Sequence, residues 1–325
     1  MWIGFILAVA FIIDILLGDP SYRLHPVRLT GRLISAIEGL LRKTGPPSVG
    51  TGVVLLVITL GVVLAVYLGV RYLLSYVGLE SLWDVYMVYS AIAFKDMFDH
   101  TEPIRDALEK EDVEEARKRT SLIVGRLTNG LGVEELSRAA VESLAEGFVD
   151  GLLTPVVWFL IGGGLGYLLG YDEAPMAVAF TITSRAVNTL DSMVGYRSPE
   201  YILLGRASAR ADDFINFLPA RLSIPVLFVA ATLLGYNGLR GIRVAARDRL
   251  KHPSPNAAHP ESFIGGTLNI RLGGAALYSD GMHEKPIIGG NSPPQPRHIE
   301  DTKKITMLAG TISVVAAIVL CAGLY

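Results

Sequence analysis

Four long stretches without a charged side chain constrain this chain more than any other feature. They cover residues 44–70, 151–171, 222–239 and 305–325. A helix needs about 20 mainly apolar residues to cross the hydrocarbon core of a bilayer, where every backbone polar group must find its partner inside the protein. Runs of this length favour helices, so the sequence predicts an all-α, polytopic membrane protein.

Weaker apolar stretches leave the number of crossings open. Residues 1–17 are interpreted as a retained first membrane helix. Residues 79–94 are either a buried helix or an imperfect span, because Glu80 and Asp84 interrupt them. We expect about five to seven spans from hydropathy, and we treat residues 1–325 as one integral membrane domain.

Two loops, at residues 18–50 and 237–304, carry five basic residues each close to a span. They are Arg23, Arg28, Arg32, Arg42 and Lys43 in the first loop, and Arg240, Arg243, Arg247, Arg249 and Lys251 in the second. The positive-inside rule places both loops in the cytoplasm, which requires an even number of crossings between them. The clear runs supply three, so either residues 79–94 or residues 176–190 also cross, or one run is re-entrant.

The polar segments differ in the structure that they predict. Residues 29–42 alternate apolar and basic residues at helical spacing, which predicts a short amphipathic helix on the membrane surface. Residues 99–140 predict a soluble helical insertion that contains an amphipathic helical pair. Residues 237–304 are rich in Gly and Pro, which favours a long, ordered, irregular loop rather than helices.

Composition and missing motifs exclude several classes of function. The net charge of −2 argues against nucleic acid as a partner. Cys321 is the only cysteine, so an intrachain disulfide and a cysteine-based zinc site are excluded. The chain has no Gly-x-x-x-x-Gly-Lys-Ser/Thr loop for phosphates. The Gly162–Gly166 run lies inside a span and favours close helix packing over nucleotide binding.

Three carboxylates precede the apolar run at residues 151–171. Glu142, Glu146 and Asp150 are spaced four residues apart, which predicts a stripe along one helix face. Oxygen ligands of this kind suit Mg²⁺, and charged groups beside a bilayer often mark function. A solvated helix face is the alternative, and the spacing alone does not separate the two.

Two further clusters flank later apolar runs. The segment Arg185–Tyr196 combines a cation, an amide and a carboxylate at Arg185, Asn188 and Asp191, and the guanidinium of Arg185 suits phosphate or carboxylate binding. An internal Arg–Asp pair that stabilises the bundle is the alternative. Asp212, Asp213 and Asn216 resemble a second oxygen-rich site, although neighbouring arginines could neutralise them.

Two His-Pro segments present polar groups from loops, where functional side chains are often held. The segment Lys251-His-Pro-Ser-Pro-Asn256 offers a cation, an imidazole, a hydroxyl and an amide. The segment His25-Pro-Val-Arg28 is similar in kind. A single His in a loop is usually structural, but two such segments favour function.

Together these segments resemble the adenosylcobinamide-phosphate synthase family of cobalamin biosynthesis, the membrane-bound cobinamide synthases. The resemblance extends through nearly the whole chain, and the segments Arg185–Tyr196 and Lys251–Asn256 are its most specific part. The other matching segments are Asp14-x-x-Leu-Gly-Asp-Pro20 with His25–Arg28, Glu142-x-x-x-Glu146 with Val149-Asp-Gly151, Ala207-Ser-Ala-Arg210-x-Asp-Asp213, and Asn216 with Pro219-Ala-Arg221. Gly147 departs from the family pattern, which has a polar residue, typically Asn, after the glutamate.

The resemblance implies an ATP-dependent ligase that joins adenosylcobyric acid to (R)-1-aminopropan-2-ol phosphate through an acyl phosphate. ATP and Mg²⁺ would be co-substrate and metal, and the site would face the cytoplasm from the cell membrane. Membrane lipid and other late membrane enzymes of the pathway are the expected partners. The amine donor is left open between aminopropanol phosphate, ethanolamine phosphate and phosphothreonine.

The resemblance also implies roles for individual residues. Catalysis is assigned to Glu142, Glu146, Asp150, His25 and His252; substrate binding to Arg28, Arg185, Asn188, Asp191, Asn216, Lys251, Ser254 and Asn256; and Mg²⁺ to Glu142, Glu146, Asp212 and Asp213.

Other classes fit the sequence less well. A transporter that uses the same polar clusters as a path should show two matching halves with polar residues in mid-span, and the chain has no internal repeat. The Asp-rich helix of a lipid alcohol-phosphate transferase is missing from the sequence. A membrane scaffold would leave the density of polar clusters unexplained.

Overall fold

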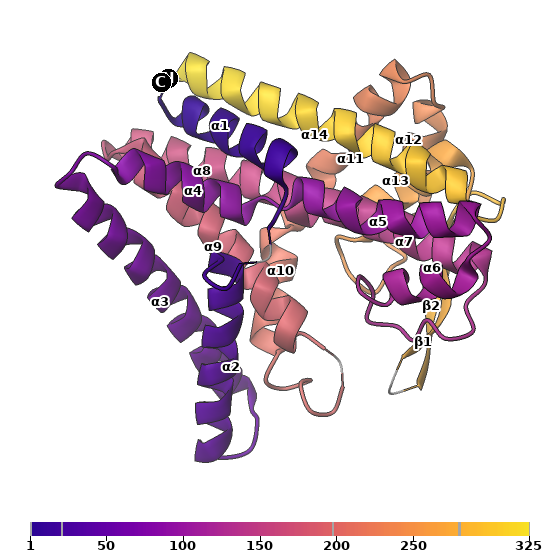
Figure 1. Cartoon of the computed structure of the whole chain (residues 1–325), viewed down its shortest axis with the longest axis horizontal. Coiled ribbons are helices and arrows are strands. Elements are labelled where there is room, and N and C mark those ends of the chain that lie inside the picture. The colour runs from indigo at the N-terminus through magenta and orange to yellow at the C-terminus, as the bar shows by residue number, and fades with distance from the viewer. Residues whose placement is uncertain (1, 21, 197, 279–280, 325) are drawn as a thin grey trace. The chain divides into compact units, whose positions relative to one another are not determined.

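The computed structural model describes residues 2–20, 22–196, 198–278 and 281–324 and is mostly helical (Figure 1). Within these residues, four helices are long and apolar enough to cross a membrane, and a shorter apolar helix covers Ile3–Leu17. The four candidates are Val49–Ser75, Val133–Leu169, Arg206–Leu233 and Pro296–Gly323, and each overlaps one of the charge-free stretches. The prediction of a polytopic helical membrane protein is confirmed.

The chain divides into two compact units. The first comprises residues 1–93, 154–215 and 314–325, and the second comprises residues 94–153 and 216–313. The helices of the first unit are α1 (Trp2–Leu17), α2 (Pro26–Thr44), α3 (Val49–Ser75), α4 (Glu80–Ala91), α8 (Thr154–Leu169), α9 (Glu173–Val194), α10 (Arg206–Ile215) and the last part of α14 (Pro296–Leu324).

The first unit has a small apolar core where α2, α3 and α9 meet. Its buried side chains are Ile34, Ile37, Leu55, Leu190, Val194 and Leu204. The core requires a close backbone approach at Gly52 of α3, where a Cβ atom would lie 2.1 Å from the carbonyl oxygen of Leu204. Helix α2 contains residues 29–42, so the amphipathic helix predicted there is confirmed.

Glycines also let α8 pack closely against α9 in the first unit. A Cβ atom at Gly162 would lie 2.5 Å from the carbonyl oxygen of Met176, and one at Gly166 would lie 3.0 Å from the Cα atom of Glu173. Small residues at such positions allow two backbones to come together in a membrane. The packing role predicted for the Gly162–Gly166 run is therefore confirmed.

Helix α4 is a buried helix of the first unit rather than a membrane span. Its 12 residues make it too short to cross a bilayer. The Asp84 side chain is fully buried and accepts hydrogen bonds from the Tyr67 hydroxyl (2.7 Å) and from Nε of Arg71 (3.1 Å). Nη2 of Arg71 also lies 3.3 Å from Oδ2 of Asp172. The network connects α3 with α4 and satisfies the charge that interrupts the apolar stretch.

Replacing Asp84 should destabilise the protein strongly. Asp84→Asn leaves the largely buried Arg71 without its main counter-charge, which costs about 3 kcal/mol. Asp172→Asn is the matched control, because Asp172 is 61% exposed and contributes less than about 1 kcal/mol. Thermal unfolding in detergent should show a clear loss only for Asp84→Asn, and equal stabilities would contradict the role of the network.

The second unit combines helices with a β-hairpin. Its elements are α5 (Phe94–Glu109), α6 (Val113–Thr120), α7 (Val133–Phe148), the π-helical turn η1 (Val149–Leu153), α11 (Phe217–Leu233), α12 (Gly238–Asp248), α13 (Ala258–Leu268), the strands β1 (Arg271–Tyr278) and β2 (Gly281–Gly289), and the first part of α14. Helices α5 and α6 confirm the helical pair predicted within residues 99–140.

The prediction of an irregular loop over residues 237–304 is wrong. The segment contains α12, α13 and an antiparallel hairpin (Figure 1). Several of its glycines permit close packing rather than an irregular backbone. A Cβ atom at Gly241 would lie 2.2 Å from Oγ1 of Thr267, and one at Gly266 would lie 2.5 Å from Cβ of Val244. Helices α12 and α13 can approach each other only because these positions lack side chains.

Candidate functional site

Helix α7 of the second unit presents Glu142 and Glu146 one turn apart on one face. The helix is regular as far as Phe148, and a π-helical turn then covers Val149–Leu153. Hydrogen bonding of the i→i+5 type distinguishes this turn from the α-helix before it. Asp150 lies in the π turn and is half-buried, and its place on the stripe of carboxylates stays a prediction.

Both carboxylate oxygens of Glu142 are engaged within the second unit. Oε1 accepts a hydrogen bond from the N–H of Gly273 (2.8 Å), and Oε2 accepts one from Nη2 of the buried Arg126 (3.2 Å). One turn earlier, Nη1 of Arg138 donates to the carbonyl oxygen of Gly273 (2.6 Å). Glu142 and Arg138 thus hold β1 against α7 by bonding the N–H and the carbonyl oxygen of Gly273.

Gly273 is the residue that this arrangement requires. It lies in an irregularity of the β1–β2 register and has a positive φ of 76°. A Cβ atom there would lie 2.2 Å from the carbonyl oxygen of Pro286. Only glycine adopts this conformation at such a short distance without strain.

Glu146 differs from Glu142 in its surroundings. Its side chain is exposed and forms no hydrogen bond or ion pair within the described part of the chain, although the positive charge of Lys285 acts on it. The neighbouring Gly147, where the family pattern has an amide, would place a Cβ atom 3.3 Å from Sδ of Met97. The side chain of Met97 therefore lies where an amide side chain at position 147 would begin.

A third glutamate belongs to this group and was not predicted from the sequence. Glu261 on α13 is 4% exposed, and burial followed by the negative charges of Glu142 and Glu146 raises its pKa well above the usual value. Lys285 and Arg126 supply opposing positive charge. We call Glu142, Glu146 and Glu261 the carboxylate cluster. The sequence signal was a third His-Pro step, His259-Pro260-Glu261, directly after the predicted Lys251–Asn256 loop.

The Lys251–Asn256 loop of the second unit is organised by its own polar groups. Nδ1 of His252 accepts a hydrogen bond from the N–H of Ser254 (3.0 Å). Oγ of Ser254 accepts from the N–H groups of Asn256 and Ala257, both at 3.3 Å. The loop is thus held by hydrogen bonds between its own groups as well as by its two prolines.

Asp248 anchors the start of this loop. Its fully buried carboxylate forms ion pairs with Nζ of Lys251 (2.6 Å) and Nη2 of Arg247 (2.6 Å). It also accepts a hydrogen bond from the N–H of Gly289 in β2 (3.0 Å). Burial opposes ionisation, but the hydrogen bonds from Arg247 and Lys251 lower the pKa of Asp248 to about 2. Lys251 therefore has a structural partner in addition to any ligand.

Removing this charge should destabilise the fold in a pH-dependent way. Because the folded-state pKa lies below the ordinary value, the stabilisation is present above about pH 4 and is lost as the pH falls toward 2. Asp248→Asn should lower the free energy of unfolding by about 2 kcal/mol at neutral pH, and by about half as much near pH 3.

Thermal unfolding in detergent at both pH values measures this difference. Glu114→Gln is the control, because Glu114 is 83% exposed and pairs only with Arg117 on the surface. A difference between wild type and Asp248→Asn that does not change with pH would contradict the ionic role.

The first unit holds the remaining predicted residues, with His25 at the start of α2. His25 is 2% exposed, its Nε2 atom lies 2.8 Å from Oδ1 of Asp19, and Tyr22 packs edge-on against its ring. These contacts fix the turn before Pro26, the first residue of α2. They favour a structural role for His25, and its catalytic assignment stays a prediction.

Arg28 lies at an open hollow on α2. The hollow has a volume of about 430 Å³ and is lined by Arg28, Gly31, Arg32, Ser35 and Met193. Neither Arg28 nor Arg32 forms an ion pair with a described residue. Two like charges four residues apart on a helix repel each other, so an anion between them would be stabilising.

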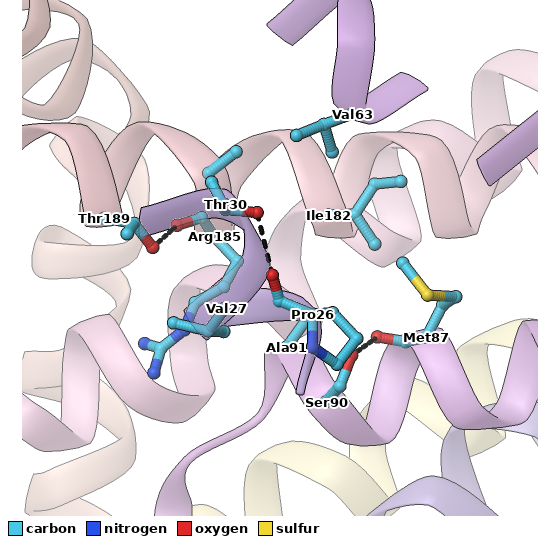
Figure 2. Close-up of a pocket in the computed structure, with 11 residues that line it drawn as sticks. Pro26, Val27, Thr30, Val63, Met87, Ser90, Ala91, Ile182, Arg185 and Thr189 are labelled. Carbon is cyan, nitrogen blue, oxygen red and sulfur yellow. Dashed lines mark hydrogen bonds between the residues drawn. The ribbon is translucent and has the colours of Figure 1, made fainter. Parts of the chain in front are cut away.

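Arg185 of α9 lines a small pocket in the first unit. Figure 2 shows its side chain passing beside Val27, with the guanidinium turned away from Val63 and Ile182. The hydroxyls of Thr30, Ser90 and Thr189 in the pocket wall each donate to a carbonyl of their own helix (Figure 2). The pocket volume of about 30 Å³ suits water rather than a large substrate.

The polar residues after Arg185 make local contacts. Nη1 of Arg185 donates to Oδ1 of Asn188 at 3.4 Å, one turn further along α9. Asp191 lies in the last turn of α9, and its backbone carbonyl accepts the N–H of Gly195. Asp212 and Asp213 are half-buried on α10, and Asn216 follows as a buried residue before α11 in the second unit.

The predicted metal ligands are divided between the units. Glu142 and Glu146 belong to the second unit, whereas Asp212 and Asp213 belong to the first. Among the residues that the structure describes, no group of three or more His, Cys, Asp or Glu side chains is placed to hold a metal ion. A Mg²⁺ ion at Glu142 and Glu146 would need phosphate oxygens and water to complete its coordination, which is usual for this ion.

Comparison with known proteins identifies the family. The model of the family described as CobD/Cbib protein matches residues 7–306. The chain belongs to the CobD/CbiB family. Its resemblance to the adenosylcobinamide-phosphate synthases of cobalamin biosynthesis is thereby confirmed.

Relatives in this family align over most of their length. Cobalamin biosynthesis protein CobD of Klebsiella pneumoniae is 40% identical over 291 residues, which cover 86% of this chain and 85% of the relative. CobD of Leptospira interrogans is 34% identical over 322 residues, covering 98% and 97%. CbiB of Salmonella typhimurium is 38% identical over 287 residues, covering 86% and 85%. No solved structure matches the chain. A role in cobalamin biosynthesis follows for this CobD/CbiB family member.

Proposed function

We propose that this CobD/CbiB family member is an ATP-dependent amide ligase. It would join a propionate carboxylate of adenosylcobyric acid to the amine of (R)-1-aminopropan-2-ol phosphate and give adenosylcobinamide phosphate. The observation that carries the proposal is the carboxylate cluster, in which the unpaired Glu146 and the buried Glu261 lie beside the anchored Glu142. Family membership supports the pathway, and the cluster supports the type of reaction.

The chemistry has two steps. A carboxylate is a poor electrophile, so its oxygen would first attack the γ-phosphorus of ATP and release ADP, leaving an acyl phosphate. The amine nitrogen would then attack the acyl carbon, inorganic phosphate would leave, and a base would take the proton from nitrogen. Mg²⁺, when bound, would neutralise charge on the transferring phosphoryl group.

The carboxylate cluster offers groups suited to these tasks. Hard oxygen donors at Glu142 and Glu146 fit Mg²⁺ held together with substrate phosphates. Glu146 is also accessible and unpaired, so it is our candidate for the base that accepts the amine proton. Glu142 already accepts hydrogen bonds from the N–H of Gly273 in β1 and from Arg126, so it is less available to accept a proton.

Several cations are candidates for binding the anionic parts of the substrates. Arg28 lies at the hollow on α2, where a phosphate would relieve its repulsion with Arg32. Arg185 and Lys251 are further candidates, although Lys251 is also paired with Asp248. Asp150, His252, Asn188, Asp191, Asn216, Ser254 and Asn256, together with Asp212 and Asp213 as metal ligands, keep the roles assigned from the resemblance. We place the site on the cytoplasmic face because ATP is found there.

Removing the charge of Glu146 tests the proposal directly. The purified protein in detergent should release ADP over many turnovers only when ATP, Mg²⁺, the corrinoid acid and the amino-alcohol phosphate are all present, and mass spectrometry should show the amide. Glu146→Gln should lower kcat about a hundredfold or more, because a positioned base contributes about 10²–10⁴.

Glu134→Gln is the matched control on the same helix. Glu134 forms a surface ion pair with Arg271 (2.9 Å) and should be dispensable for the reaction. Full activity in Glu146→Gln would remove that residue from the mechanism. No amide under any combination of substrates would overturn the ligase proposal.

A further inference from the structure

Three helices of the second unit bring together two arginines and a histidine that the proposed reaction has not used. Arg221 lies on α11, Arg249 directly follows α12, and His259 lies in the first turn of α13. Asn256 completes the group from the loop before α13. We call Arg221, Arg249, Asn256 and His259 the arginine–histidine site.

Arg221 is held in position from one side. Its Nη1 atom donates to the carbonyl oxygen of Phe217 (2.6 Å) and to Oδ1 of Asn256 (3.2 Å). The guanidinium carbon lies 3.4 Å from the centre of the Phe217 ring. These contacts orient the cation but give it no negative charge, and no described carboxylate forms an ion pair with it.

Arg249 also has no counter-charge among the described residues. Its neighbours Arg247 and Lys251 are both paired with Asp248, so the acidic group nearest in sequence is already engaged. The charge on Arg249 acts instead on Arg221 and on His259. Two half-buried like charges repel each other more strongly than they would in water.

His259 adds unmet hydrogen-bonding capacity. Its side chain is fully buried, and neither ring nitrogen forms a hydrogen bond of normal geometry with a described residue, although the backbone of Asn256 lies close to the ring. Burial, and then the charges of Arg221 and Arg249, lower its pKa to about 4, so the imidazole is neutral at pH 7. A buried polar group without a partner is unfavourable in a folded protein and points to a ligand or another partner.

We propose that Arg221 and Arg249 bind the phosphate monoester of the amine substrate, with Asn256 beside them and neutral His259 forming the inner wall of the site. This assignment rests on the proposed function. Guanidinium groups match the geometry of a phosphate dianion. Binding of the dianion would replace the repulsion between the two arginines with two charge-assisted interactions.

Among the described residues, no acidic side chain forms an ion pair with Arg221 or Arg249. This observation indicates which of the two phosphorylated substrates, ATP or the amino-alcohol phosphate, fits the site. ATP acts with Mg²⁺, which requires carboxylate oxygens of the kind that the carboxylate cluster provides. The arginine–histidine site offers cations and neutral groups only. It therefore fits a phosphate that binds without metal, which is the amino-alcohol phosphate rather than the nucleotide.

Phosphate-dependent stability tests the site without requiring turnover. The melting temperature of the purified protein in detergent is measured against inorganic phosphate, with chloride added to keep the ionic strength constant. Wild type should be stabilised by phosphate, and Arg249→Gln should weaken the apparent phosphate affinity about tenfold or more. Arg243→Gln is the matched control, because Arg243 is an exposed arginine of α12 that forms no ion pair with a described residue.

The same melts distinguish a ligand-binding arginine from a structural one. Without phosphate, Arg249→Gln should be at least as stable as wild type, since it removes the repulsion with Arg221. A structural arginine would instead make the variant less stable at every phosphate concentration. The proposal is overturned by that result, by equal phosphate responses in Arg249→Gln and wild type, or by no response in wild type beyond that to chloride.

Kinetics then identify the substrate. In the ligase assay, Arg249→Gln should raise KM for the amino-alcohol phosphate about tenfold while leaving KM for ATP unchanged. A raised KM for ATP alone would overturn the assignment to the amine substrate. If no amide forms in wild type, the proposed function fails, whereas the phosphate melts still decide whether the anion site exists.

Discussion

The second unit depends on one carboxylate that ties a helix to a hairpin. Glu142 of α7 accepts the N–H of Gly273 while Arg138 of the same helix donates to its carbonyl oxygen, so both polar groups of one strand residue are satisfied by α7. An isolated two-stranded hairpin is marginally stable in water and requires such support. The constraint fixes Glu142, and Glu146 one turn further on is left without a partner in the described chain. A structural carboxylate and the carboxylate that we propose as the base can therefore occupy adjacent turns.

The sequence correctly predicted the elements that depend only on residues close together in the chain. The spans, the amphipathic α2 and the close packing of α8 on α9 follow from long apolar runs, from alternation and from glycines inside a span. Residues 237–304 were misinterpreted because glycine has two uses. At Gly241 and Gly266 it permits contact between helices, which depends on neighbours far apart in the sequence. Turn propensity does not distinguish that use from an irregular loop.

The candidate site could be predicted only in part for the same reason. Glu142 and Glu146 followed from helical spacing, but the spacing did not predict the π turn that contains Asp150. Glu261 was missed because its significance comes from burial beside α7, not from its neighbours in sequence. From the sequence alone, His25 and Glu146 were both assigned a catalytic role. In the structure, His25 is buried against Asp19, whereas Glu146 is exposed and unpaired.

The basic residues from Arg240 to Lys251 form one cluster in the sequence, but they have different roles in the structure. As a group they follow the positive-inside rule, which needs only their number and place. In the fold, Arg240 donates to the carbonyl oxygens of Gly266 and Thr267 at the end of α13, and Asp248 neutralises Arg247 and Lys251. Arg249 is different, because its positive charge acts on another cation, Arg221, and on the neutral His259. A topological signal explains why these positions are basic. It does not explain why two cations interact without a counter-ion among the described residues, an arrangement that a bound anion would stabilise.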